Sequence, residues 1–299
     1  MKKNYLLNEL ESESISIIRD SFSKSLNSVL MYSIGKDSSV LLHLAIKAFY
    51  PSPIPFPLLH IDTTWKFKEM YRFKEKIKKK LNIKIITYIN FDGLKKQIDP
   101  ANNSSAHTNL MKTKALKDAI DYYKFDLIFG GARRDEEQSR SKERIVSLRE
   151  KNHIWNPKNQ RPELWNLFNY NKNQDQTFRI FPLSNWTEED IWRYISQENI
   201  DIVNLYFAKK RPTIIRNGSI FLIDDNRFLL KKNEKIIFRK IRFRTLGCYP
   251  LTTALESNAT TIKKILQENK TINYSERAGR LIDSDKIDSM EIKKKDGYF

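Results

Sequence analysis

Short apolar runs alternate with helical patterns through the first 131 residues. Between the runs, apolar side chains recur at helical spacing over 37–50, 67–81 and 111–123, and residues 1–26 show the same spacing. This alternation, at the lengths of βαβ units, predicts an α/β fold with a parallel twisted sheet and helices on both faces. The four runs are SVLMYS (28–33), FPLLHID (56–62), IKIITYI (83–89) and FDLIFGG (125–131).

The alternation loosens after about residue 140. The stretch RIFPLSNWTEEDIW (179–192) predicts a short strand and then a helix with Thr187 as its N-cap. The pattern of residues 218–247 predicts a β-rich appendage, and the charge of residues 289–299 predicts an exposed tail. We therefore predict an α/β domain over 1–215 and an irregular C-terminal extension over 216–299.

Composition excludes several classes of protein. Hydrophobic residues at 40% and aromatic residues at 12% argue against global disorder. No apolar run reaches the about 18 residues that cross a bilayer, and the N-terminus turns acidic after two lysines, so we expect a cytoplasmic protein. The single cysteine, Cys248, excludes an internal disulfide and a multi-cysteine metal site within one chain.

The net charge of +18, from 54 basic and 36 acidic residues, raises the question of nucleic-acid binding. The lysines are spread along the chain among many Asn and Ile residues instead of forming one block. This distribution favours a diffuse basic surface that attracts small anions. A nucleic-acid-binding module stays an alternative, and a steep salt dependence of RNA binding would reveal it.

Polar or glycine-rich residues follow three of the predicted strands, at 33–39, 60–65 and 130–135. In open parallel sheets, ligands bind beyond the carboxyl ends of the strands, near the point where the strand order reverses. These three strand exits are therefore where we expect the functional site.

The first exit, YSIGKDSSV (32–40), has the composition of an anion-binding loop. Gly35 allows close backbone approach, Lys36 adds positive charge, and the start of a helix presents free N–H groups. The spacing is not that of a Walker A loop, because no glycine stands five residues before Gly35. We expect Asp37 either to cap the helix or to help hold Mg²⁺. Hydroxyl donors would come from Ser33, Ser38 and Ser39.

The S-x-G-K-D-S pattern after the first strand resembles the loop of the ATP pyrophosphatase (PP-loop) superfamily. From about residue 10 to residue 299, the chain is similar to the small subunit of bacterial sulfate adenylyltransferase, which is related to phosphoadenylyl-sulfate reductases. That resemblance implies an adenine nucleotide alpha hydrolase-like fold. Its motifs are PFPLLHIDTTWKF, FGGARRDEEQSRSKERI, WNPKNQRPELWN, RIFPLSNWTEEDIW, RFRTLGCYPLT, SERAGRLID and the final GYF.

The resemblance implies adenylyl transfer from ATP to sulfate, which forms adenosine 5'-phosphosulfate and pyrophosphate in the first step of sulfate assimilation. ATP is then a substrate and Mg²⁺ accompanies it. Because this exchange of anhydrides is strongly uphill, the resemblance also implies a GTPase large subunit that drives the reaction within a heterodimer. We expect the partner contact in the C-terminal half.

The resemblance also implies roles for individual residues. The pyrophosphate loop is Ser33, Gly35, Lys36, Asp37, Ser38 and Ser39. The nucleotide-facing residues are His60, Asp62, Gly130 and Gly131, with Asp37 and Asp62 as candidate Mg²⁺ ligands. The predicted catalytic set is Lys36, Asp37, Arg133 and Arg134. Because guanidinium groups match tetrahedral oxyanions, the candidate sulfate ligands are Arg133, Arg134, Arg242 and Arg244.

Two departures and two rival functions stay open. Thr64 and Thr253 stand where the family commonly has glycine, and either would be strained if its φ is positive. A related reductase needs a cysteine in a C-terminal segment, whereas Cys248 lies about 50 residues from the end and is predicted to be buried and inert. An RNA-modifying PP-loop enzyme usually needs two cysteines or an added RNA domain.

Overall fold

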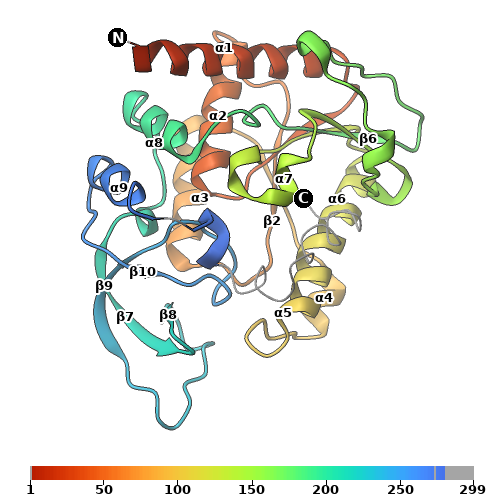
Figure 1. Cartoon of the computed structure of the whole chain (residues 1–299). Helices are drawn as coiled ribbons and strands as arrows, with labels where there is room; N and C mark the ends of the chain where they lie inside the picture. Colours follow the sequence, from red (N-terminus) through yellow and green to blue (C-terminus); the bar gives the residue numbers. More distant parts are fainter. Residues whose placement is uncertain (1, 273, 280–299) are drawn as a thin grey trace.

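The structure, a computed structural model, describes residues 2–272 and 274–279. Its body contains a six-stranded sheet in the order β3-β2-β1-β4-β6-β5. Strands β2 and β6 of this sheet are labelled in Figure 1. Neighbouring strands pair in parallel except β5, which runs antiparallel to β6 at the edge. The strands are β1 (Ser28–Met31), β2 (Leu58–Ile61), β3 (Ile85–Tyr88), β4 (Leu127–Phe129), β5 (Val146–Arg149) and β6 (Thr177–Ile180). The predicted parallel sheet is confirmed, and β5 is an addition to it.

Helices cover both faces of this sheet, as predicted. Alternate residues of β1 point to opposite faces, so Leu30 joins the large core under α1, α2, α3 and α8, while Val29 packs against α6. The helices are α1 (Lys2–Ser23), α2 (Lys36–Phe49), α3 (Lys68–Leu81), α4 (Phe91–Lys95), α5 (Ser104–Thr108), α6 (Ala115–Tyr123), α7 (Gln138–Ser141), α8 (Glu188–Gln197) and α9 (Ile262–Asn269).

Two local features of the helices matter below. A π-helical turn, Asn109–Lys114, joins α5 to α6, so the predicted helix over 111–123 is irregular at its start. Thr187 caps α8 in a reciprocal capping box with Asp190, as predicted. Short 3₁₀ turns occur at Arg134–Glu136, Lys151–His153, Pro157–Asn159, Leu164–Asn166, Asn204–Tyr206 and Glu276–Gly279.

A second, four-stranded antiparallel sheet follows in the order β10-β9-β7-β8, at the lower left of Figure 1. It confirms the β-rich character predicted for 218–247. Because β7 already pairs with β9 at Lys209, this sheet begins before the predicted boundary at 215/216. Its strands are β7 (Lys209–Arg216), β8 (Ser219–Leu222), β9 (Ile237–Arg242) and β10 (Leu255–Glu256).

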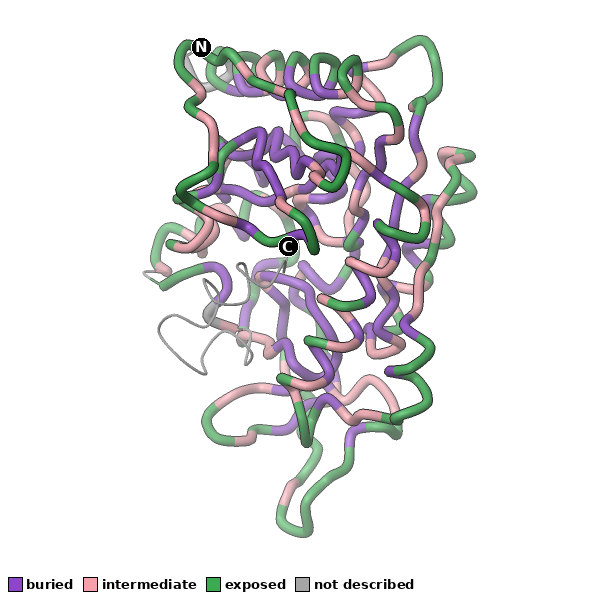
Figure 2. The backbone as a smooth tube through the Cα atoms, turned by 90° about the vertical axis from the view of Figure 1, so that its right-hand side faces the viewer, coloured by how far each residue is buried: buried purple, intermediate pink, exposed green. Residues whose placement is uncertain are grey.

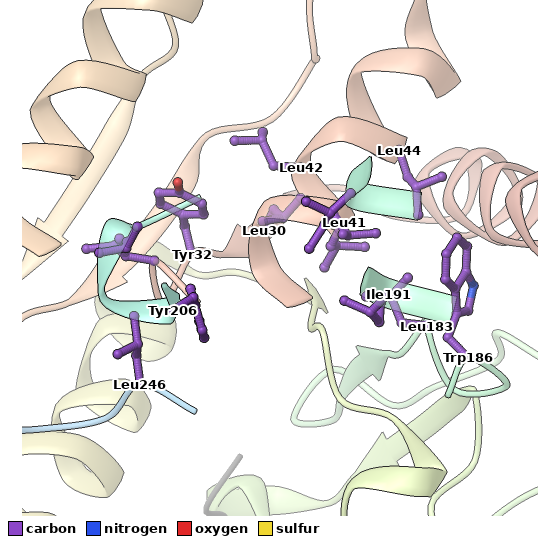
Figure 3. Close-up of a cluster of buried hydrophobic side chains, with 14 of the residues drawn as sticks. Leu30, Tyr32, Leu41, Leu42, Leu44, Leu183, Trp186, Ile191, Tyr206 and Leu246 are labelled. Carbon is purple, nitrogen blue, oxygen red and sulfur yellow. The ribbon is translucent and has the colours of Figure 1, made fainter. Parts of the chain in front are cut away.

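Buried segments run through the middle of the molecule, and exposed stretches form its outer loops (Figure 2). Leu41 and Leu44 of α2 face Ile191 of α8 in the core close-up (Figure 3). Within residues 2–272 and 274–279, no helix is both long and apolar enough to cross a membrane. The predicted tail, 289–299, lies outside the described residues.

Candidate active site

A cavity of about 200 Å³ lies at the carboxyl ends of β1 and β4. These two strands form the point where the strand order reverses, because the chain leaves β1 for β2 and β3 and returns to β4 on the other side. Ligands of open α/β sheets bind at such a point. The walls come from the loop after β1, the exit of β4, the π-helical turn, Tyr206, residues 245–247 and the segment at 276–277.

The loop after β1 has a fixed conformation around the first turn of α2. Gly35 is the N-cap of α2, and the hydroxyls of Ser38 and Ser39 each donate to its carbonyl oxygen at 3.0 Å. Ile34 is fully buried and has a φ of 68°, a conformation that β-branched residues rarely adopt. Packing of the Ile34 side chain therefore holds a strained backbone that turns Ser33 and Gly35 toward the cavity.

Two buried cations lie beside this loop. Lys36 is 0% exposed and Arg133, which follows β4, is 1% exposed. Asp37 joins them, because one carboxylate oxygen accepts from Lys36 Nζ at 3.1 Å and the other accepts from Arg133 Nε at 2.7 Å. The carboxylate of Glu276 also contacts both Lys36 and Arg133. Of this paired cluster, Asp37 and Glu276 line the cavity, whereas Lys36 and Arg133 are buried next to these carboxylates and do not line it.

The pKa values in this cluster follow from burial and pairing. Burial alone would raise the pKa of Asp37, but the charges of Lys36 and Arg133 outweigh it and hold that pKa below its usual range. Burial would lower the pKa of Lys36, and the carboxylates of Asp37 and Glu276 raise it instead. Both cations and Asp37 are therefore charged at neutral pH. Asp37 is paired with cations and does not cap the helix, since Gly35 occupies that place.

Gly131 brings β4 into direct contact with the start of α2. A Cβ atom added to Gly131 would lie 3.2 Å from the carbonyl carbon of Asp37 and 3.3 Å from the amide nitrogen of Ser38. Gly131 also lines the cavity, whereas Gly130 continues the sheet by donating to the carbonyl of Ile180 at 2.8 Å. The two predicted glycines thus lie side by side with different surroundings.

His60 and Asp62, predicted to face a nucleotide, both point into the protein. The carbonyl of Tyr32 accepts a hydrogen bond from His60 Nδ1 at 2.8 Å, which fixes the proton on that nitrogen. Burial and the charge of Lys66 lower the pKa of His60 to about 4. One oxygen of Asp62 accepts from the amide of Thr64 and from the Tyr71 hydroxyl, both at 2.8 Å. These residues fix the loop after β2 and do not line the cavity.

The predicted arginines separate into two groups. Arg133 lies in the buried cluster, whereas Arg134 points outward and donates to the side chain of Asn185 at 2.7 Å. Arg242 is buried on β9 and pairs with Glu268 at 2.7 Å. Arg244 pairs with Glu188 at 2.7 Å. Arg134, Arg242 and Arg244 do not line the cavity.

Several cavity residues were not predicted as site residues. Lys66 follows β2 by five residues, and Lys112 reaches the cavity from the π-helical turn. Arg140 and Arg277 also line it, and each forms an ion pair with Glu136. The Tyr206 hydroxyl accepts from the amide of Lys36 at 2.9 Å.

The two unusual threonines differ in conformation. Thr64 has a φ of 60°, so the strain expected for threonine at a glycine position is present there. Thr253 is not among the residues with positive φ, and both its amide and its hydroxyl donate to the carbonyl of Gly279 at 2.9 Å. Only the first departure from the family pattern therefore strains the backbone.

Cys248 is buried, as predicted, with 1% of its surface exposed. Its sulfur lies 3.1 Å from the hydroxyl of Thr63. Burial would raise the pKa of this thiol, but the nearby charges of Lys112 and Lys66 bring it below its ordinary value. The thiol is thus close to the cavity wall formed by Gly247 without lining the cavity itself.

The sheet and the cavity at its switch point define a nucleotide-binding α/β protein of the adenine nucleotide alpha hydrolase-like class. Residues 27–254 match the family described as the phosphoadenosine phosphosulfate reductase domain. The chain is also similar in fold to the FMN adenylyltransferase of Candida glabrata in complex with FAD and inorganic pyrophosphate, with a TM-score of 0.52 and 16% identity. That similarity covers 99% of this chain and 85% of the other.

Full-length relatives narrow the class further. The chain is 56% identical to the sulfate adenylyltransferase subunit 2 of Psychromonas ingrahamii over 100% of both chains. It is 56% identical to the protein of the same name from Burkholderia lata, over 98% of this chain and 99% of the relative. The chain therefore belongs to the sulfate adenylyltransferase subunit 2 family, which confirms the resemblance of its motifs.

Proposed function

We propose that this chain transfers the adenylyl group of ATP to sulfate. A sulfate oxygen attacks the α-phosphorus of ATP, the bond from that phosphorus to the bridging oxygen of the β-phosphate breaks, and the electron pair leaves on pyrophosphate. The products are adenosine 5'-phosphosulfate and pyrophosphate. Since sulfate is fully ionised at neutral pH, the reaction requires no general base, and catalysis consists of positioning and neutralising charge.

The observation that carries this proposal is the buried pair Lys36 and Arg133 beside the first turn of α2. Two desolvated cations and the amides of a helix N-terminus suit the several negative charges of a departing pyrophosphate. Gly131 supports the same interpretation, because its lack of a side chain lets the end of β4 approach the backbone of that turn beside the cavity. In this proposal the cavity-lining loop residues Ser33, Gly35 and Ser38 contribute donors to the pyrophosphate. The predicted donor Ser39 does not line the cavity, because its amide and its hydroxyl both donate to the carbonyl of Gly35 at 3.0 Å.

Sulfate then binds on the other side of the α-phosphorus, within reach of cations that line the cavity. Lys66, Lys112 and Arg140 are such cations, and they support this part of the proposal. Arg133 would contact the α-phosphate and sulfate from the cluster. Contacts of sulfate with Arg134, Arg242 or Arg244 would require these side chains to leave Asn185, Glu268 and Glu188 respectively.

Magnesium fits this site as part of the substrate, MgATP, more than as a resident ion. Within the described chain no group of three or more His, Cys, Asp or Glu side chains is arranged to hold a metal. Of the two predicted ligands, Asp37 lines the cavity and Asp62 does not. Mg²⁺ usually binds through one or two carboxylates, water and substrate phosphates, so Asp37 would supply the single protein carboxylate.

We further propose that a GTPase subunit drives the uphill reaction in the cytoplasm. The relatives are named subunit 2, which supports a partner subunit. We assign its contact to the C-terminal extension over 216–299, together with contacts to the sulfonucleotide. The exposed apolar side chains of Leu229, Ile237 and Phe238 on that extension support this assignment.

The test is pyrophosphate release from ATP by the chain with its partner subunit and GTP, with and without sulfate. We expect release to require sulfate and to fall about 100-fold in Lys36→Ala, the loss typical of one preorganised charge donor. Cys248→Ser should keep near-normal adenylation, whereas a reductase would lose all activity. Sulfate-independent release would contradict the proposal.

A further inference from the structure

The segment that holds Glu276 brings a negative charge into the proposed pyrophosphate site. Glu276 is 6% exposed, and one of its carboxylate oxygens contacts Lys36 Nζ while the other contacts a terminal nitrogen of Arg133. It is 240 residues from Lys36 in the sequence. These are the two cations that we assign to pyrophosphate.

Polar contacts at the rim of the cavity hold this segment in place. The Ser275 hydroxyl donates to the carbonyl of Glu136 at 3.2 Å. Arg277 pairs with Glu136 at 3.1 Å and with Glu137 at 3.3 Å. The carbonyl of Gly279 accepts both bonds from Thr253. None of the described side chains of this segment belongs to the hydrophobic core, so its withdrawal would break polar contacts, which can exchange for bonds to water.

Lys36 and Arg133 need a counter-charge whenever no ligand is bound. A buried cation without an anionic partner is strongly unfavourable. Asp37 contacts both cations, whereas the half-exposed carboxylate of Asp135 lies 3.4 Å from Arg133 alone. Glu276 is the second carboxylate that contacts both cations. Pyrophosphate would satisfy the same two cations, so Glu276 and pyrophosphate are alternative occupants of one place.

We propose that the Glu276 carboxylate competes with pyrophosphate for Lys36 and Arg133, withdraws when the β- and γ-phosphates of ATP enter, and returns as pyrophosphate leaves. This inference rests on the proposed function and deepens it, because it makes Glu276 a residue that sets pyrophosphate affinity. Competition inside the protein lowers the apparent affinity by the fraction of molecules in which the site is free. Pyrophosphate is thereby released more readily than from a site with permanently exposed cations.

Calorimetric titration of pyrophosphate into the whole chain tests this competition. Glu276→Gln keeps the shape of the side chain and removes its charge, so we expect pyrophosphate to bind about tenfold tighter or more. The matched control is Glu189→Gln, which removes the same charge from an exposed pair with Arg193 on α8. It should leave the affinity unchanged. Equal or weaker binding by Glu276→Gln would overturn the inference.

A second measurement uses the unaltered chain and so does not depend on a variant that folds. Amide hydrogen exchange over residues 275–279 should become faster when pyrophosphate is added, while the later turns of α2 should not change. Slower or unchanged exchange over 275–279 would contradict withdrawal of the segment.

Lys36→Ala separates this inference from the proposed function. We call Lys36, Arg133 and the first turn of α2 the pyrophosphate cradle. If pyrophosphate binds the unaltered chain and Lys36→Ala equally, both this cradle and the competition with Glu276 are refuted. If Lys36→Ala weakens binding but Glu276→Gln does not tighten it, only the role of Glu276 is refuted.

Discussion

The segments that follow β1 and β2, here called the first and second exits, lie side by side at one end of the same sheet. The first faces the cavity, and the second faces the protein interior. Each carries polar residues directly after a buried strand, and each turns through a β-branched residue with positive φ, Ile34 at 68° and Thr64 at 60°. The first exit presents Ser33 and Gly35 to the cavity. The second turns His60 and Asp62 into the protein.

Partners from distant parts of the chain produce this difference. At the first exit, Asp37 is held by Arg133 from the end of β4. At the second, Asp62 is held by Tyr71 of α3, and His60 donates to the backbone of β1's own exit at Tyr32. The exit of β2 thus supports the exit of β1, and polar residues after a strand do not by themselves mark a ligand contact.

The largest expected change in stability comes from removing Arg133, the cation that holds Asp37 at the first exit. Arg133→Ala removes one of the two buried cations that hold the carboxylates of Asp37 and Glu276 and leaves Lys36 alone against both, so we expect unfolding to become easier by about 3–5 kcal/mol. Arg134→Ala removes an outward side chain and should cost less than about 1 kcal/mol. Urea unfolding measures both. Equal costs would break the distinction between these two neighbours.

His60, at the second exit, should affect how the stability of the protein depends on pH. Because the pKa of His60 is lowered to about 4 in the folded protein, protonation favours the unfolded chain. The contribution of His60 is present above pH ~6.5, its ordinary pKa, and is lost as pH falls toward 4.

His60→Gln should therefore lose stability less steeply than the unaltered chain over that range, by up to about 1.4 kcal/mol per pH unit. Urea unfolding at several pH values gives the slopes. Identical slopes for both chains would show that His60 is not held neutral.

Two glycines at the first exit should respond differently to a methyl group. Gly131→Ala forces its Cβ against the backbone of Asp37 and Ser38, so we expect a loss of about 1–3 kcal/mol. In Gly35→Ala the nearest atom is the Ser33 hydroxyl oxygen at 3.4 Å, an ordinary contact, and the loss should stay below about 1 kcal/mol. Thermal unfolding ranks the pair, and a reversed order would refute the close approach of β4 to α2.

The smallest effect concerns the two threonines. Thr64→Gly removes the strain of a positive φ but also loses the hydroxyl bond to the carbonyl of Thr63 at 2.7 Å, so we expect a net stabilisation of at most about 0.5 kcal/mol. Thr253→Gly loses a hydroxyl bond to Gly279 at a residue without positive φ and should destabilise it by about 1 kcal/mol. Denaturant midpoints measure both changes. Stabilisation by both substitutions would contradict the assigned conformations.

Local pattern was sufficient to predict the parallel sheet and the helices that cover it. It was not sufficient for β5, because these four residues form a strand by pairing with β6. Side chains of the following loop also hydrogen-bond to the backbone at the start of β5. There the carboxylate of Glu163 binds the amides of Ile145 and Val146. The spacing of apolar residues does not distinguish a π-helical turn from an α-helix. The sequence therefore did not predict that Lys112 lines the cavity.

Residues of the candidate site could be predicted where they are adjacent in one loop. They could not be predicted where contacts between distant parts of the chain bring them together. Lys36, Asp37 and Gly35 stand together in the sequence, and Arg133 follows a strand exit. Arg242 and Arg244 have the right chemistry, but Glu268 and Glu188 hold them outside the cavity. The position of Glu276 depends on a contact across 240 residues, which no local spacing reveals.

The most direct test of the proposed function is its reverse reaction, because the reversal of an uphill exchange runs downhill and forms ATP from adenosine 5'-phosphosulfate and pyrophosphate without an energy source. Lys36→Ala should reduce the rate of ATP formation about 100-fold or more. The control is Lys47→Ala on the same helix, whose side chain pairs with Glu11 and Glu198 away from the cavity, and it should keep the rate of the unaltered chain. A Lys36→Ala chain that forms ATP as fast as Lys47→Ala would contradict the pyrophosphate cradle.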